Sequence, residues 1–433
     1  MNKSITVIIF SLIPFVCFAQ NQNEDYFADD FVRYQDWIYK KNIHTVQLRE
    51  NSYEMAAPLI NLNSDQQLKL SFDDFDGGVK NYMYSLIHCD ANWKPSDIPI
   101  PDYINGFFED NISNYEFSLN TLQKFTHYTL VFPSSSMKLT KSGNYIIKVF
   151  EDGNKDVPVL TKRFMVAENL VSVIGNVHQA AGADDYFNKQ EVDFSVVFSG
   201  YKITNPFADL KIVITQNNRW DNALYGLKPI FTKENELTFD YDDGSNCFNG
   251  GNEFRNFDTK SLRFLSPNLK SIVRDSIGGF NIELQQEEIK TFKRYYQNPD
   301  LNGEFIIRVQ EGSDERTEAE YCKVNFFFPY EQAVNDGNFY VLGKFCDWKI
   351  GKENMLQYNA KKRGYETTLF LKQGFYNYMY VFSEDGKFSG DETLIEGNHW
   401  ETENDYTIYV YHRRQGTYYD QLISVRKLNS IRK

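Results

Sequence analysis

The chain has 433 residues and a formal net charge of −13 at pH 7. A single hydrophobic core does not extend over this length, so two or three domains are expected. The negative charge repels phosphate backbones and no basic stripe crosses the body of the chain, which argues against nucleic acid as a partner.

The N-terminus has the layout of a cleavable secretory signal. Lys3 supplies a positive charge, residues 5–18 are apolar, and Ala19 offers a small residue for cleavage. We therefore expect an exported, soluble protein that is cleaved near Ala19. Cys17 invites a lipoprotein interpretation, but the bulky Val16 stands where lipid attachment needs a small residue. No later apolar stretch approaches the ~20 residues of a membrane-spanning helix, so no direct transmembrane anchor is expected.

The rest of the chain reads as β-strands joined by tight turns. Aromatic residues, which favour half-buried strands, make up 16% of the sequence. Apolar and polar residues alternate at 68–72, 192–197 and 210–214, as in strands with one buried face. Asp-Gly pairs typical of hairpin turns follow such runs at Asp76–Gly77, Asp152–Gly153, Asp243–Gly244, Asp336–Gly337 and Asp385–Gly386. The segment 284–296 is expected to be irregular or a short helix.

These patterns predict an all-β fold class of tandem Ig-like or early-set antiparallel β-sandwich domains. A strand series closes near Val166, and an apolar strand at 324–328 runs into Pro329 before a new strand at 339–342. The expected parts are a signal peptide (1–19), an N-terminal β-sandwich (20–166), a middle β-sandwich (167–329) and a C-terminal early-set sandwich with a basic tail (330–433).

No constellation of residues indicates catalysis, a metal or a cofactor. No two histidines have the spacing of a metal pair on a helix, so structural or surface roles are expected for His44, His88, His127, His178, His399 and His412. The run from Asp73 to Gly77 resembles a calcium loop, but an EF-hand register puts Phe72 at position one and Met83 at position twelve. This run and 240–244 are therefore interpreted as solvated hairpin turns. No nucleophile elbow occurs, and we expect no enzymatic activity.

Four cysteines follow the signal sequence, and none has a redox or zinc-finger spacing. We expect mostly buried thiols, while disulfide pairing after export stays open for Cys89, Cys247, Cys322 and Cys346.

Three clusters, at 88–93, 216–222 and 250–258, together mix Trp, Asn, Asp, Glu and Arg. Trp and Arg dominate binding hot spots, so the partner-contacting candidates are Trp93, Trp220, Glu253, Phe254 and Arg255. The alternative is that the tryptophans pack a sandwich core and that an ion pair between Glu253 and Arg255 holds a loop.

The same clusters carry a family resemblance, together with the runs 43–48, 71–77, 138–145, 260–263 and 403–406. Their order resembles the type IX secretion system plug proteins of Bacteroidota over nearly the whole mature chain. The resemblance implies a periplasmic protein that binds and occludes the periplasmic end of the outer-membrane translocon, a SprA-type barrel, between transport events. A barrel wide enough for folded cargo would leak without such a plug.

The C-terminal runs 340–348, 365–371, 374–378 and 384–388 are similar to the early-set sandwich of glycogen-binding modules. That similarity aligns Trp348 with a sugar-stacking tryptophan and places Phe388 at the second stacking position. An exported glycan-binding protein is therefore the alternative function. Because aromatic platforms also serve protein interfaces, Trp348 and Phe388 join the five partner-contacting candidates above, which makes seven. The basic C-terminal residues are expected to be a solvated last strand and tail, with contact to anionic lipid or an acidic channel rim as the alternative: His412, Arg413, Arg414, Arg426, Lys427, Arg432 and Lys433.

Overall fold

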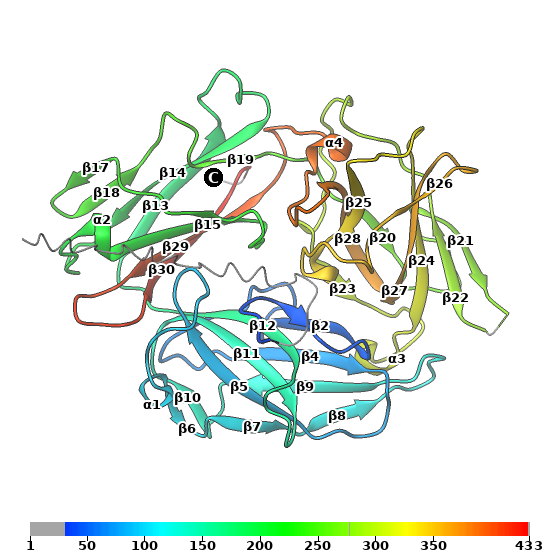
Figure 1. Ribbon diagram of the computed structural model, residues 1–433, viewed down its shortest axis with the longest axis horizontal. Coiled ribbons are helices and arrows are strands. Elements are labelled where there is room, and N and C mark those ends of the chain that lie inside the picture. The colour runs from blue at the N-terminus through cyan, green and yellow to red at the C-terminus, as the bar shows by residue number, and fades with distance from the viewer. Residues whose placement is uncertain (1–30, 277, 432–433) are drawn as a thin grey trace, which may run out of the picture.

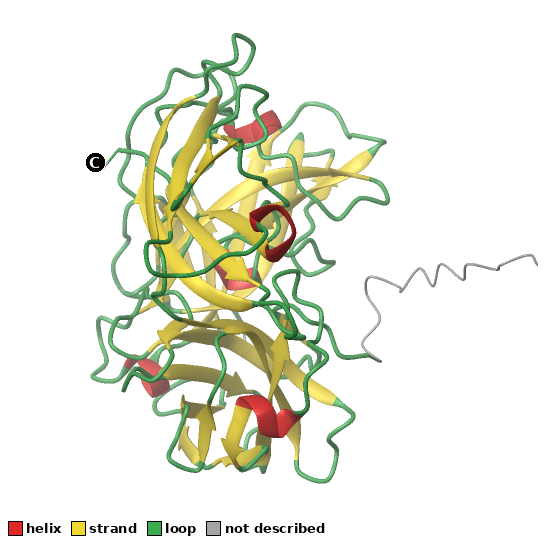
Figure 2. Cartoon of the chain, turned by 90° about the vertical axis from the view of Figure 1, so that its left-hand side faces the viewer, coloured by secondary structure: helices red, strands yellow, loops and turns green. Residues whose placement is uncertain are grey.

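The structure is a computed structural model that describes residues 31–276 and 278–431. The expected signal peptide, Cys17, Arg432 and Lys433 lie outside these residues. The expected all-β fold is confirmed, because strands build three sandwich units and the helices within residues 31–276 and 278–431 are single short turns (Figures 1 and 2). None of the helices among the described residues has the length and apolar character needed to cross a membrane.

The first unit packs two antiparallel sheets around one aromatic-rich core. One sheet has the order β1 (Trp37–Ile38), β12 (Pro158–Ala167), β11 (Gly143–Glu151), β5 (Tyr82–Cys89) and β7 (Glu109–Ile112), with β3 (Leu59–Asn61) parallel to β12. The other has the order β2 (Ile43–Glu50), β4 (Leu68–Asp74), β9 (Thr126–Phe132) and β8 (Asn114–Phe117). A short ladder of β6 (Ile104–Gly106) and β10 (Met137–Leu139) follows α1 (Ile100–Tyr103). As alternation predicted, Leu68, Leu70 and Phe72 of β4 point into this core.

The second unit combines strands from the middle and the end of the chain. Its first sheet has the order β13 (Ser172–Gln179), β14 (Lys189–Val197), β18 (Glu236–Phe239) and β17 (Phe231–Lys233), with β19 (Cys247–Asn249) also paired to β14. Its second sheet has the order β16 (Leu224–Tyr225), β15 (Leu210–Gln216), β29 (Asp405–His412) and β30 (Gln421–Asn429), and α2 (Pro206–Asp209) precedes β15.

The third unit lies between these two parts of the second unit in the sequence. One sheet joins β20 (Arg255–Asp258), β28 (Gly374–Glu384), β23 (Phe305–Ile307) and β25 (Gly337–Leu342). The other has the order β21 (Leu269–Arg274), β22 (Phe280–Leu284), β24 (Tyr321–Pro329), β27 (Gly364–Lys372) and β26 (Gln357–Asn359), with β22 parallel to β24. Short turns are α3 (Glu315–Glu318), the 3₁₀ helix η1 (Lys344–Cys346) and α4 (Thr393–Glu396).

The sheets correct the expected boundary between 329 and 330. Strand β24, before the boundary, pairs with β27 after it, and β15 of the middle segment pairs with β29 near the C-terminus. The third unit is thus an insertion in the second, visible in Figure 1 as yellow and orange strands beside a green sheet that red strands complete. A break in alternation marks the end of a strand, but it carries no information about which strand pairs with which.

The Asp-Gly pairs predicted turns better than the strand pattern predicted the domain boundary. Gly77, Gly153, Gly244 and Gly386 of the Asp-Gly pairs adopt positive φ. Gly337 instead begins β25, where a Cβ atom would lie 2.3 Å from the carbonyl oxygen of Ser383, so close strand packing requires this glycine. The segment between β22 and β23 is irregular apart from isolated turns, in agreement with the interpretation of 284–296.

Candidate functional site

The first and second units meet at an aromatic pair that the sequence had assigned to a partner surface. Trp93, in the loop after β5, packs edge to face on Trp220, with ring centroids 4.9 Å apart. The guanidinium of Arg163 on β12 lies 4.6 Å from the centroid of Trp93 and 5.7 Å from that of Trp220. Trp93 is 3% exposed, so this stack holds two units of the chain together.

Asp420 supports the same junction with charge. Its buried carboxylate accepts hydrogen bonds from the backbone of Ala91 in the first unit at 2.9 Å and from Lys211 Nζ at 2.7 Å. The Nε of Arg413 donates at 2.6 Å to the other oxygen. Burial raises the pKa of Asp420, but these donors outweigh burial and leave the pKa below its usual value. Arg413, expected in a solvated tail, is therefore part of the junction.

The second and third units meet at Trp348. Its ring lies 5.8 Å from that of Phe254, between centroids, and the guanidinium of Arg219 lies 4.7 Å from its centroid. Arg219 also pairs with Glu392 at 2.7 Å. A Cβ atom on Gly303 would stand 2.2 Å from the Trp348 ring, so glycine is needed for the ring to fit.

The expected ion pair between Glu253 and Arg255 is not formed. Arg255 on β20 is buried and its Nε donates to both oxygens of Glu396 at 2.9 Å. Glu253 accepts hydrogen bonds from the Tyr295 hydroxyl and the Glu403 backbone instead, and burial raises its pKa. Sequence adjacency identified two buried charged groups but paired them wrongly.

Burial corrects the list of partner-contacting candidates. Trp93, Glu253, Phe254, Arg255 and Trp348 are all buried inside the chain, and Trp220 is half-buried in a junction. Phe388 alone among the seven is exposed, at 47%. In the alternative glycan platform, Trp348 is not available to stack on a sugar, because it is only 7% exposed and its ring packs against Phe254 and Arg219.

The first and third units meet at Asp73, which corrects its interpretation as part of a solvated turn. Asp73 on β4 is fully buried and receives hydrogen bonds from Lys372 Nζ at 2.7 Å and the Tyr321 hydroxyl at 2.6 Å. His127 Nδ1 lies 2.6 Å from its other oxygen. Burial raises the pKa of Asp73, but the charge of Lys372 and the hydrogen bonds outweigh burial and lower the pKa overall. By contrast, Asp242 and Asp243 lie in an exposed turn, as expected.

The four described cysteines are free thiols, two buried and two half-buried. Burial raises the pKa of Cys89 to about 12 and that of Cys346 to about 11. Burial, with Glu191 nearby, also raises the pKa of Cys247 to about 12. The thiol rather than the nucleophilic thiolate therefore predominates at neutral pH.

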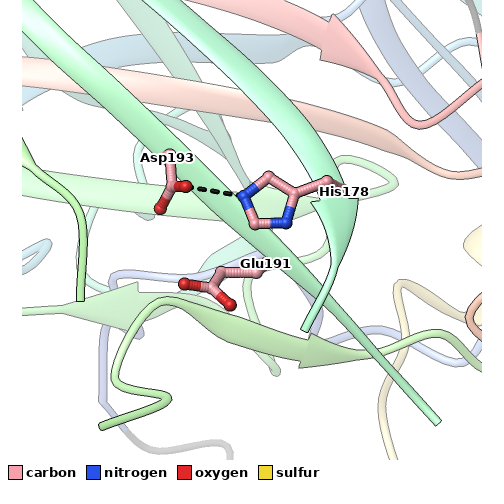
Figure 3. A group of neighbouring side chains, drawn as sticks. All are labelled: His178, Glu191 and Asp193. Atoms are coloured by element: carbon pink, nitrogen blue, oxygen red, sulfur yellow. Dashed lines mark hydrogen bonds and ion pairs between the residues drawn. The ribbon is translucent and has the colours of Figure 1, made fainter. Parts of the chain in front are cut away.

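One group of potential metal ligands was missed in the sequence. His178, Glu191 and Asp193 have side-chain ligand atoms that all lie within 4.8 Å of one another (Figure 3). His178 is on β13 and the two carboxylates are on β14, so no spacing along one segment could reveal the group. Burial lowers the pKa of His178, but its hydrogen bond to Asp193 outweighs burial and raises the pKa overall.

Comparisons with known proteins place these features in a wider context. A family model described as the type 9 secretion system plug protein 1st domain matches residues 43–168, within the first unit. The chain is similar to the crystal structure of a hypothetical protein from Parabacteroides merdae, with 31% identity and a TM-score of 0.88, over 92% of this chain and 100% of that one. A search of curated proteins finds no match.

Two further solved structures carry no argument about the fold. Collagen adhesin from S. aureus is 6% identical with a TM-score of 0.11, covering 91% of this chain and 94% of that chain. Dimeric latent PorU from Porphyromonas gingivalis is 10% identical with a TM-score of 0.14, covering 90% of this chain and 34% of that chain.

Proposed function

Because this chain belongs to the type 9 secretion system plug protein family, we propose that it binds and occludes the periplasmic end of an outer-membrane translocon, a SprA-type barrel, between transport events. The family match over the first unit is the observation that carries this proposal. Family membership also indicates a role in the cell envelope as a component of the secretion machinery.

A plug must keep a stable shape, and the three junctions between the units support this requirement. A wide barrel leaks ions and solutes unless a body of stable shape fills its lumen or mouth. Buried charges join the first unit to the third, and an edge-to-face pair of tryptophans joins it to the second. A body joined in this way keeps its shape against a rim, and occlusion requires binding rather than catalysis.

The junctions also restrict which residues are available for the channel. Five of the seven candidates are buried and Trp220 is half-buried, so Phe388 remains the candidate for direct contact. Replacing it with serine removes an apolar contact without opening a core. We expect Phe388→Ser to reduce co-purification with the channel. The matched control is Phe292→Ser, because Phe292 is 98% exposed. This control shows whether the loss of any exposed phenylalanine has the same effect.

Outer-membrane permeability tests the proposal directly. Deleting the gene should make the outer membrane more permeable to large solutes, and expression of the wild-type chain should restore the barrier. The control is a strain that lacks both this protein and the channel, in which no leak should appear. Unchanged permeability in a deletion strain that retains an open channel would contradict the proposal.

A further inference from the structure

Cross-strand pairing brings His178, Glu191 and Asp193 together on the first sheet of the second unit. His178 of β13 stands directly opposite Glu191 of β14 in the antiparallel ladder. Asp193 is two residues further along β14, so its side chain lies on the same face of the sheet. Cys247 of β19 is opposite Glu191 on the other side of β14, but it is not part of the group whose ligand atoms lie within 4.8 Å of one another.

The hydrogen bonds of His178 define which ring nitrogen carries a proton. Nδ1 lies 2.8 Å from the carbonyl oxygen of Gln179, which can only accept, so Nδ1 donates. Nε2 lies 2.6 Å from Asp193 Oδ2. In a neutral imidazole Nε2 would then present a lone pair to a carboxylate, so this contact holds a second proton, and a metal ion that replaces the proton must move the two atoms apart. Histidines that bind metals through one nitrogen typically donate the other to a carbonyl in this way.

Neighbouring groups hold both carboxylates in place through hydrogen bonds. Glu191 is 3% exposed, and its Oε2 accepts a hydrogen bond from the Ala181 backbone at 2.9 Å. Asp193 Oδ1 accepts one from Nδ2 of the fully buried Asn246 at 2.9 Å. The amide oxygen of Asn246 has no hydrogen-bond partner. Within the described part of the chain, no lysine or arginine forms an ion pair with Glu191 or Asp193.

We propose that His178, Glu191 and Asp193 bind a divalent transition-metal ion of the zinc class. One imidazole with two carboxylates suits zinc better than calcium or magnesium, which prefer oxygen ligands alone. Three protein ligands leave one tetrahedral position open, and the His178 side chain is 38% exposed, so an ion can enter from solvent. Ligand atoms ~2 Å from zinc stand roughly 3.3 Å apart, so small side-chain rotations would suffice to form the site.

Zinc titration of the metal-free protein by calorimetry tests the site. The wild-type chain should bind one zinc ion, and His178→Ala and Asp193→Asn should each weaken binding at least ~10-fold. Zinc should also raise the melting temperature of the wild-type chain, because it binds only the folded state, and this rise should vanish in both variants. Glu236→Gln, which removes a carboxylate from β18 of the same sheet, should change neither measurement.

Two outcomes would overturn the proposal. If zinc does not bind at concentrations well above that of the protein, the contact between His178 and Asp193 is an ion pair and not a metal site. Equal zinc affinity in the wild-type chain and both variants would place binding elsewhere. The melting temperature of each metal-free variant shows whether it folds, and Asp193→Asn, which keeps the size of the side chain, serves if His178→Ala does not fold.

Discussion

His88 is a buried histidine whose two ring nitrogens are both satisfied in the neutral state. Nδ1 accepts a hydrogen bond from the Ser96 hydroxyl at 2.8 Å, and Nε2 donates to the Ser142 carbonyl oxygen at 3.1 Å. Gly143 lies so close that a Cβ atom there would be 2.6 Å from Nε2. Burial lowers the pKa of His88 to about 4, so this position disfavours a charged ring.

His88 should therefore make the protein sensitive to acid. The unfolded chain takes up a proton at this residue near its ordinary pKa of about 6.5, whereas the folded chain does so only near pH 4. Stability is thus lost as the pH falls from about 6.5 through 4, by about 3 kcal/mol from this residue. In His88→Gln, the amide can replace both hydrogen bonds without titrating. Between pH 6.5 and 4 the variant should therefore lose about 3 kcal/mol less stability than the wild-type chain.

Urea denaturation at a series of pH values measures the effect. A comparison at pH 7.5, where the wild-type side chain is neutral in both states, isolates the packing cost of glutamine from its effect on titration. Parallel stability curves for the wild-type chain and the variant between pH 6.5 and 4 would show that His88 does not contribute.

At this scale the sequence identified important residue types but not their surroundings. Trp93 and Trp348 were recognised as anchors, and both do anchor interfaces, but the interfaces lie within the chain. Tryptophan stacks equally well on a partner and on another unit of the same chain. Only the strand pairing decides between the two, and pairing is not encoded in any single cluster.

At the scale of elements, β4 and β27 from different units share a buried charge network. Lys372 of β27 is 2% exposed and donates to Asp73 of β4 and to the carbonyl oxygen of Arg316, both at 2.7 Å. Its ammonium also lies 4.2 Å from the centroid of Phe125. A buried pair of this kind offsets its own desolvation cost only while both partners are present.

Lys372→Met should therefore destabilise the protein by about 3–5 kcal/mol, because Asp73 is left buried without its cation. The double variant Asp73→Asn/Lys372→Met should recover part of the loss, since no unpaired charge remains. Tyr321→Phe removes one neutral donor to the same carboxylate and should cost only about 1–3 kcal/mol. Denaturant midpoints of the wild-type chain, the two single variants and the double variant measure this order of stability. A double variant less stable than Lys372→Met would contradict this explanation.

The elements themselves were largely predictable, whereas their partners were not. The alternation in 68–72 identified β4 and its buried face. The aspartates that follow were expected in water because Asp before Gly is typical of turns, yet Asp73 is covered by β24 and β27 of a distant unit. Alternation is a property of one strand, and pairing depends on residues far away in the sequence.

At the scale of the whole molecule, a second buried charge contact joins the first and third units. Lys162 of β12 lies 2.6 Å from Asp347, which follows η1, and their side chains are 3% and 6% exposed. Lys344 lies 3.5 Å from Asp36 beside them. Burial raises the pKa of Asp36, but Lys162 and Lys344 outweigh burial and bring the pKa below its usual value, so the Asp36 carboxylate remains charged at neutral pH.

These contacts predict that the three units unfold together. Multidomain chains commonly unfold in several steps, and a single calorimetric transition whose enthalpy equals the van't Hoff enthalpy would show that the junctions couple the units. Asp347→Asn removes the carboxylate that Lys162 contacts directly, which weakens one junction, while asparagine tolerates the positive φ of 53° at this position. The variant should therefore unfold in two resolved steps.

Asp385→Asn provides the matched control, because Asp385 is exposed in a hairpin turn of the same third unit. This control should keep the single transition. If the wild-type chain already unfolds in separate steps, the junctions do not couple the units, and a plug would need the channel itself to hold its parts in place. If Asp347→Asn also uncouples the units and raises outer-membrane permeability without lowering protein abundance, then occlusion depends on the fixed arrangement of the three sandwiches.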